Sequence, residues 1–292
     1  MRANLAIGAA HAPNLAAHFG AHVVQALIDE VTLAPKPGLV DIRSRGAHHD
    51  LDWQLMRASA LALQPTFVEL ARAGIETQAL LALRERIGAI GRAGEARMFD
   101  ATGGVNTHRG AIWALGLLVT AAARDPDDLA PQAVAARAGS IVRVQDRHAP
   151  AITGNKGEQA CLDYNVGGAR GQAQAGFPHV VDIALPELAR SRSRGDSETA
   201  ARLNALLAVM ASLDDTCVLA RGGPDALADM QHGARRVLEQ GGAAALAGRR
   251  ELKALDRRLI ELHVSPGGAA DLLAAALFLD RLQREAHPTT KA

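Results

Sequence analysis

The chain has 292 residues, a formal net charge of +1 at neutral pH, 48% hydrophobic residues and only 3% aromatic residues. The hydrophobic fraction is too high for a disordered chain, and the balanced charge argues against a general nucleic-acid binder. Because Ala and Leu dominate while β-branched runs are scarce, the composition favours helices over strands.

Helical periodicity covers most of the chain. Residues 1–13 are expected to form a flexible tail, and from Asn14 apolar residues recur at helical spacing. Further helices are predicted over 51–73, 76–97, 107–124, 130–144, 158–175, 179–193, 198–221, 225–240, 243–262 and 266–284. No alternating strand pattern or internal repeat is found. We therefore predict an all-α protein, a single compact domain of roughly ten or more helices spanning 14–286, with a C-terminal tail over 287–292.

The sequence shows no pattern typical of a signal peptide or of a membrane-spanning helix. The start of the chain lacks a basic segment followed by a long apolar run, which argues against a signal peptide. The longest apolar stretch, Ala111 to Ala123, is too short for a bilayer and is expected to be a buried helix. Cys161 and Cys217 show neither disulfide nor metal-ligand spacing. We therefore expect a cytoplasmic protein with reduced thiols and no membrane partner.

The segment from Glu30 to Asp52 concentrates ionisable groups in an otherwise Ala- and Leu-rich chain. Prolines on both sides of Lys36 fix φ and exclude helix, so Lys36 is placed on a stiff, extended loop. Glu30 lies on the flank of the preceding apolar stripe. The run His48-His49-Asp50 has the chemistry of a metal site, but as an isolated tripeptide it fits a polar loop with Asp50 as helix N-cap better.

Two glycine-rich segments are further candidates. In A-T-G-G-V-N-T-H-R-G, Ala101 to Gly110, glycines precede a helix start, which is an anion-binding arrangement that His108 and Arg109 would extend. The alternative is a plain connector with Asn106 as the helix cap. Between Gly154 and Pro178, Arg170 has the chemistry to clamp a phosphate, or it is a surface arginine in a turn.

Charged residues interrupt the core stripe of the helix predicted over 198–221. If that helix runs through, Asp214 and Arg221 lie on the same face as its leucines. A buried charge is costly unless it is paired or bound to a ligand, so the two residues indicate either a structural ion pair or a site. The adjacent Asp215 could equally face solvent.

Together these motifs resemble the triphosphoribosyl-dephospho-CoA synthase family, whose members make prosthetic-group precursors for citrate lyase and malonate decarboxylase. The similar segments are E-V-T-L-A-P-K-P-G-L-V-D with G-A-H-H-D-L-D, G-V-N-T-H-R-G-A-I-W-A-L-G-L-L, G-G-A-R-G-Q-A-Q-A-G-F-P, L-D-D-T-C-V-L-A-R-G-G and S-P-G-G-A-A-D-L-L-A. They follow one another from Glu30 to Ala274. Three positions depart from the family pattern: Arg109 replaces Lys, Gln172 replaces Glu and Cys217 replaces Asn. A catalytic role at 172 is therefore in doubt, and position 217 is expected to act indirectly.

The resemblance implies an all-helical enzyme with ATP and 3′-dephospho-CoA as substrates. The 5-triphosphoribosyl group of ATP would pass to the ribose 2′-hydroxyl of 3′-dephospho-CoA, with release of adenine, giving 2′-(5″-triphosphoribosyl)-3′-dephospho-CoA. Chain length favours the malonate decarboxylase branch over citrate lyase. A homodimer is expected because symmetric dimers are the commonest oligomers.

This reaction allows roles to be assigned to the candidate residues. A carboxylate acting as base or stabilising the oxocarbenium-like sugar would come from Glu30, Asp50 or Asp52. Glu30 is preferred as base, since desolvation beside an apolar stripe raises a carboxyl pKa. The nucleotide-binding candidates are Lys36, Asn106, His108, Arg109, Arg170 and Arg221. Mg²⁺ accompanying ATP would use Asp50, Asp52 and Asp214. Arg43 and Arg45 either hold the acceptor's pyrophosphate or belong to a solvated loop.

Two other function classes fit parts of the sequence. A helical metal-dependent phosphohydrolase would use His49 and Asp50 with His22 and Asp100, and it would release phosphate instead of adenine. It leaves the T-H-R-G and G-A-R-G segments unexplained. A non-catalytic helical interaction module would bind no ATP, and the glycine loops and the charged stripe argue against it.

Overall fold

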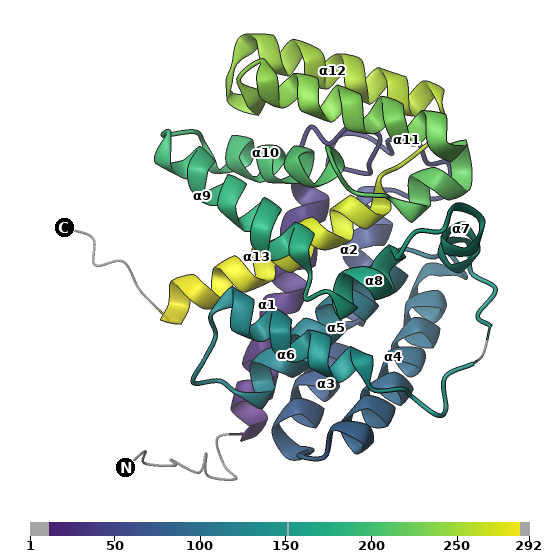
Figure 1. Cartoon of the computed structure of the whole chain (residues 1–292), viewed down its shortest axis with the longest axis vertical. Helices are drawn as coiled ribbons and strands as arrows, with labels where there is room; N and C mark the ends of the chain where they lie inside the picture. Colours follow the sequence, from purple (N-terminus) through teal and green to yellow (C-terminus); the bar gives the residue numbers. More distant parts are fainter. Residues whose placement is uncertain (1–11, 151, 287–292) are drawn as a thin grey trace.

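The computed structural model describes residues 12–150 and 152–286, and every regular element in these two segments is a helix (Figure 1). The predicted all-α, multi-helix fold is confirmed. The elements are α1 (Ala12–Thr32), α2 (Trp53–Ala62), α3 (Gln64–Glu76), α4 (Leu80–Thr102), α5 (Arg109–Arg124), α6 (Pro131–Arg143), α7 (Lys156–Tyr164), α8 (Gly168–Gln174), the π-helix η1 (His179–Ala184), α9 (Leu185–Ser193), α10 (Glu198–Met210), α11 (Thr216–Glu239), the 3₁₀-helix η2 (Gly242–Ala244), α12 (Leu246–Glu261) and α13 (Gly267–Ala286).

Helices α5 and α13 form the centre of the core. From Ala111 to Ala123 every residue of α5 except Trp113 is buried, so the apolar stretch is the core helix that the sequence predicts. Helix α1 packs against α3 and α13, and α5 packs against α3 and α13 (Figure 1). Helices α11 and α12 form a pair at one end of the molecule. Within the described residues, no helix is both long and apolar enough to cross a membrane.

Two predicted helices are broken, each for an identifiable backbone reason. The prediction over 51–73 is wrong at Leu63, where α2 ends and α3 begins with a proline in its first turn. The prediction over 158–175 is wrong at Asn165, whose φ of 52° ends α7 in the left-handed region. The helix predicted over 225–240 is confirmed as the second part of α11, because Gly223, with φ 68° and ψ −167°, is not helical and separates it from the part that begins at Thr216.

The helix predicted over 198–221 does not run through, which changes the position of its charged residues. Helix α10 ends at Met210, and Asp215 caps a new helix by accepting hydrogen bonds from the backbone N–H groups of Cys217 and Val218. Asp214 and Arg221 therefore do not share a core stripe. Helix α1 begins at Ala12, two residues before the predicted start. The tails predicted over 1–13 and 287–292 otherwise lie outside the described residues.

The loop between α1 and α2 is held in place by one buried carboxylate. Asp41 accepts hydrogen bonds from the backbone N–H groups of Lys36 at 3.1 Å, Arg43 at 2.7 Å and Ser44 at 2.9 Å. The N–H of Gly38 donates to Asp256 of α12 at 2.9 Å. These bonds satisfy buried backbone donors and fix the segment that carries Lys36.

Close packing of α3 on α5 generates a prediction about stability. A Cβ at Gly74 would lie 2.3 Å from the carbonyl oxygen of Thr120, so Gly74→Ala should force the helices apart and lower the free energy of unfolding by about 1–3 kcal/mol. Gly91 in α4 has nothing within 4 Å of the same position, so Gly91→Ala should raise that free energy by about 0.5–1 kcal/mol. Urea unfolding of both variants measures the difference, and equal effects would contradict the packing argument.

Candidate active site

The last turn of α1 and the loop after it form a buried ion pair. Glu30 is 4% exposed and Lys36 is 2% exposed, and the Lys36 ammonium donates to the Glu30 carboxylate. Burial raises the pKa of Glu30, and the positive charge of Lys36 opposes this shift. The predicted base and the predicted phosphate ligand thus contact each other. An ion pair held this far from water is expensive, which marks the position as a functional candidate.

Asp271 of α13 is a second carboxylate at this position, and the sequence analysis assigned it no role. Its pKa is raised well above the ordinary range, first by burial and then by the negative charges of Glu30 and Asp215. Gly110, in the first turn of α5, leaves room for it, because a Cβ there would lie 2.0 Å from a carboxylate oxygen of Asp271. The signal for Asp271 was a lone acid among apolar residues of a predicted core helix.

Asp215 is the third carboxylate, and it connects two helices. It is 1% exposed, and it accepts hydrogen bonds from the N–H groups of Cys217 in α11 and Ala269 in α13, both at 2.9 Å. Burial raises its pKa, and these backbone donors oppose the rise. We call Glu30, Asp215 and Asp271 the carboxylate cluster. Asp214, the predicted metal ligand next to it, is exposed in the loop before α11.

Cys217 lies beside the carboxylate cluster, and its indirect role stays a prediction. Burial raises the pKa of its thiol, and the negative charges of Asp215 and Asp271 raise it further. The positive charge of Arg221 opposes these effects. The thiol is therefore protonated at neutral pH and is no nucleophile.

His108 is buried at the start of α5, and its side chain contacts other groups than the side chain of the next residue, Arg109. Its Nδ1 lies 3.0 Å from the Ser59 hydroxyl, and its Nε2 has no hydrogen-bond partner among the described residues. Burial, followed by the charge of Lys36, lowers the pKa of His108 to about 4. Arg109 instead pairs with Glu95 at 3.0 Å. The two residues do not form the single anion site that the glycine-rich segment suggested.

A surface pocket of about 500 Å³ lies next to the cluster. Its lining residues are Ala47, His48, His49, Asp50, Arg221 and His263. Burial lowers the pKa of His48, and the positive charge of Arg221 lowers it further, while Asp50 at 3.6 Å opposes both effects. Because the charge of Arg221 also acts on Cys217, Arg221 connects the pocket with the carboxylate cluster.

The predicted metal ligands Asp50, Asp52 and Asp214 do not lie together in one site. Asp52, and not Asp50, caps α2 by accepting from the N–H of Leu55 at 2.9 Å, and it pairs with Arg45 at 3.2 Å. Among the described residues, Asp50, Asp52 and Asp214 do not form a preassembled three-carboxylate metal site. Asp52 is occupied by the cap, and Asp50 is open in the pocket.

Asn106 acts as a helix cap, and Arg170 lies on the surface. The side chain of Asn106 accepts from the N–H of Arg109 at 3.2 Å, as a connector cap would. Arg170 is exposed on α8. The histidine and aspartate set of the phosphohydrolase alternative is not assembled in the described segments either, because His22 contacts His18 and Glu285 instead.

Known proteins resemble this chain over nearly its whole length. Residues 16–290 match the family model CitG, ATP:dephospho-CoA triphosphoribosyl transferase. The chain is 57% identical over 272 residues to the probable 2-(5″-triphosphoribosyl)-3′-dephosphocoenzyme-A synthase of Azotobacter vinelandii, covering 93% of both chains. It is 55% identical over 263 residues to the 2-(5″-triphosphoribosyl)-3′-dephosphocoenzyme-A synthase of Klebsiella pneumoniae, covering 90% of this chain and 94% of that one. No solved structure matches.

The buried His108 generates a prediction about pH. Its pKa in the folded protein lies below the ordinary value of 6.5, so on acidification the unfolded chain binds a proton here that the folded protein does not. Between pH 7 and pH 5 this difference should lower the free energy of unfolding by about 2 kcal/mol. In His108→Gln that part of the loss should disappear. Urea unfolding at both pH values measures it, and equal losses in the two proteins would refute the assignment.

Proposed function

The chain belongs to the ATP:dephospho-CoA triphosphoribosyl transferase family, and from this membership we propose that it moves the triphosphoribosyl group of ATP to the ribose 2′-hydroxyl of 3′-dephospho-CoA. Adenine is the leaving group. The observation that carries the proposal in this chain is the carboxylate cluster together with a pocket that Arg221 lines. Glycosyl transfer requires carboxylates at the sugar and positive charge at the triphosphate.

Two proton transfers accompany the exchange of bonds. The C1′–N bond of ATP breaks, and a bond forms between C1′ and the acceptor's 2′-oxygen. The 2′-hydroxyl loses a proton, and adenine gains one. An ionised carboxylate can accept the proton of the 2′-hydroxyl, and a protonated carboxyl group can donate a proton to adenine.

In our proposal Glu30 is the base and Asp271 is the acid. The adjacent Lys36 favours the ionised form of Glu30, which is the form that accepts the proton of the 2′-hydroxyl. Burial and two neighbouring negative charges favour the protonated form of Asp271, which is the form that donates to adenine. The negative charge of Glu30 also stabilises positive charge that develops at C1′. Asp215 is a positioning residue, because its oxygens hold the N-termini of α11 and α13.

The triphosphate is assigned to the pocket. Arg221 and His48 line its wall. His108 does not line the pocket; it is buried, its Nε2 has no partner in the described segments, and it stays a predicted nucleotide ligand. We keep Mg²⁺ as a proposal, because triphosphates bind proteins with Mg²⁺, which needs only one or two carboxylates besides phosphate oxygens. Asp50 suits this role, since it is open in the pocket. Arg109 and Arg170 stay as predicted nucleotide ligands.

Three further proposals come from the sequence. The malonate decarboxylase prosthetic group is the proposed destination of the product. The cysteine pattern favours the cytoplasm. A homodimer is expected because dimers are the commonest symmetric assemblies.

Product analysis tests the activity directly. Purified protein incubated with ATP, Mg²⁺ and 3′-dephospho-CoA should release free adenine and give an adduct heavier by one triphosphoribosyl group, seen by mass spectrometry. ADP or inorganic phosphate without adenine would replace the proposal by the phosphohydrolase alternative. A folded protein that yields neither set of products would favour the interaction module.

The acid role is tested by Asp271→Asn. Asp271 has no ion-pair partner in the described residues, so its replacement strands no buried cation, whereas Glu30→Gln would leave Lys36 unpaired at a cost of about 3–5 kcal/mol. We expect Asp271→Asn to lower kcat for adenine release at least about 100-fold while ATP binding is retained. Asp225→Asn, at an exposed position of α11, is the matched control. Unchanged turnover in a folded Asp271→Asn protein would remove Asp271 from the mechanism.

A further inference from the structure

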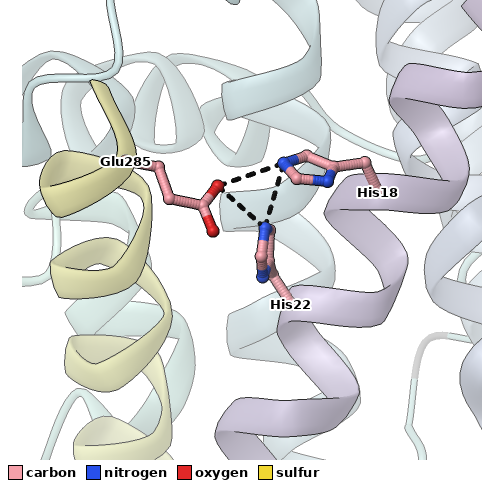
Figure 2. A group of neighbouring side chains, drawn as sticks. All are labelled: His18, His22 and Glu285. Atoms are coloured by element: carbon pink, nitrogen blue, oxygen red, sulfur yellow. Dashed lines mark hydrogen bonds and ion pairs between the residues drawn. The ribbon is translucent and has the colours of Figure 1, made fainter. Parts of the chain in front are cut away.

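A second cluster of chemically reactive side chains lies away from the pocket. His18 and His22 occupy successive turns of α1, and both face Glu285 near the end of α13 (Figure 2). The Nε2 atoms of His18 and His22 lie 3.1 and 3.0 Å from the same oxygen of Glu285, and they lie 3.0 Å from each other. Within the described segments, no other three side chains of metal-ligating type come this close.

Hydrogen bonding does not satisfy this triangle when Glu285 is ionised. If both Nε2 atoms carry hydrogen, two N–H donors point toward each other, with their nitrogen atoms 3.0 Å apart and no acceptor between them. If one Nε2 carries none, its lone pair faces the lone pairs of the carboxylate oxygen. In either case one of the three contacts is repulsive. A cation bound between the three atoms makes all three contacts favourable.

The ligand set and its spacing select the kind of cation. Two imidazoles and one glutamate form a set that binds Zn²⁺, with bonds of about 2.0–2.2 Å. Tetrahedral bonds of that length place the ligand atoms about 3.3–3.4 Å apart, only a few tenths of an ångström more than the separations here. Mg²⁺ prefers oxygen ligands throughout, so it suits the set poorly.

The cluster is accessible from the solvent. The side chains of His18 and Glu285 are 51% and 45% exposed, so an ion can enter and keep water at its fourth position. Burial lowers the pKa of His22, with smaller contributions from His18 and Arg281 in the same direction, and Glu285 opposes them. Arg281 is itself paired with Asp29 at 2.8 Å.

We propose that His18, His22 and Glu285 form a Zn²⁺ site that fastens α1 to α13. The same two helices carry Glu30 and Asp271 of the carboxylate cluster. At about 1.5 Å per residue, Glu30 lies roughly 12 Å along α1 from His22, and Asp271 lies roughly 21 Å along α13 from Glu285. The bound ion would therefore stabilise the helix pair without contacting the proposed substrates.

The test is zinc binding to tag-free, full-length protein, measured by calorimetry and by metal content after dialysis. We expect one Zn²⁺ per chain, and a rise in Tm of about 4 °C when free zinc is a hundredfold above Kd. His18→Gln and Glu285→Gln should each weaken binding at least about tenfold, because each removes one of three ligands. His232→Gln, an exposed histidine on α11, and His49→Gln, in the pocket, should bind zinc as the wild type does.

Three results would overturn the site. The first is a wild-type protein that binds no zinc at micromolar concentration. The second is a Glu285→Gln protein that binds zinc as tightly as the wild type. The third is a His49→Gln protein that loses the binding. Adenine release by zinc-free Glu285→Gln should equal that of zinc-free wild type, so this test is independent of the proposed transfer reaction.

Discussion

The buried ion pair of Glu30 and Lys36 is the interaction on which the candidate site depends. Three carboxylates that influence one another would repel strongly in a low-dielectric interior, and Lys36 is the cation that contacts one of them there. The loop that carries Lys36 is in turn held by Asp41. The conformation of this loop therefore places the positive charge of Lys36 beside Glu30, where it opposes the rise in the pKa of Glu30 that burial causes, whereas the pKa of Asp271 is raised by burial and by negative charges alone.

Three helix N-termini meet around the same position, and they supply the rest of the stabilisation. Helix α5 begins beside His108, while α11 and α13 begin where Asp215 accepts their backbone N–H groups. The positive ends of helix dipoles favour anions, whether protein carboxylates or substrate phosphates. Gly110 permits the close approach of Asp271 because it has no side chain. This explains why glycines and polar residues accumulate at the starts of these three helices.

The sequence was informative wherever local patterns decide the structure. Helical periodicity predicted the all-α fold and the buried α5, and the proline-rich segment led to Glu30 and Lys36. The sequence pattern failed where a single side chain competes with helical periodicity. Asp215 caps the new helix α11, so the apolar stripe of the preceding helix does not continue. As a result Asp215 is buried, whereas the pattern had predicted burial for Asp214. Asp271 gave a weak signal, because its neighbours Glu30 and Asp215 become neighbours only through tertiary packing of α13.

The distribution of the carboxylate cluster along the chain has a consequence for biosynthesis. Glu30 belongs to the first described helix and Asp271 to the last, and α13 completes the core between α1 and α5. A nascent polypeptide still lacking α13 has no Asp271, and its α1 lacks one of its packing partners. Since chains emerge from the ribosome N-terminus first, partly synthesised molecules lack one member of the carboxylate cluster. On the roles proposed for Glu30 and Asp271, competence to transfer the sugar would therefore arise only when translation is essentially finished.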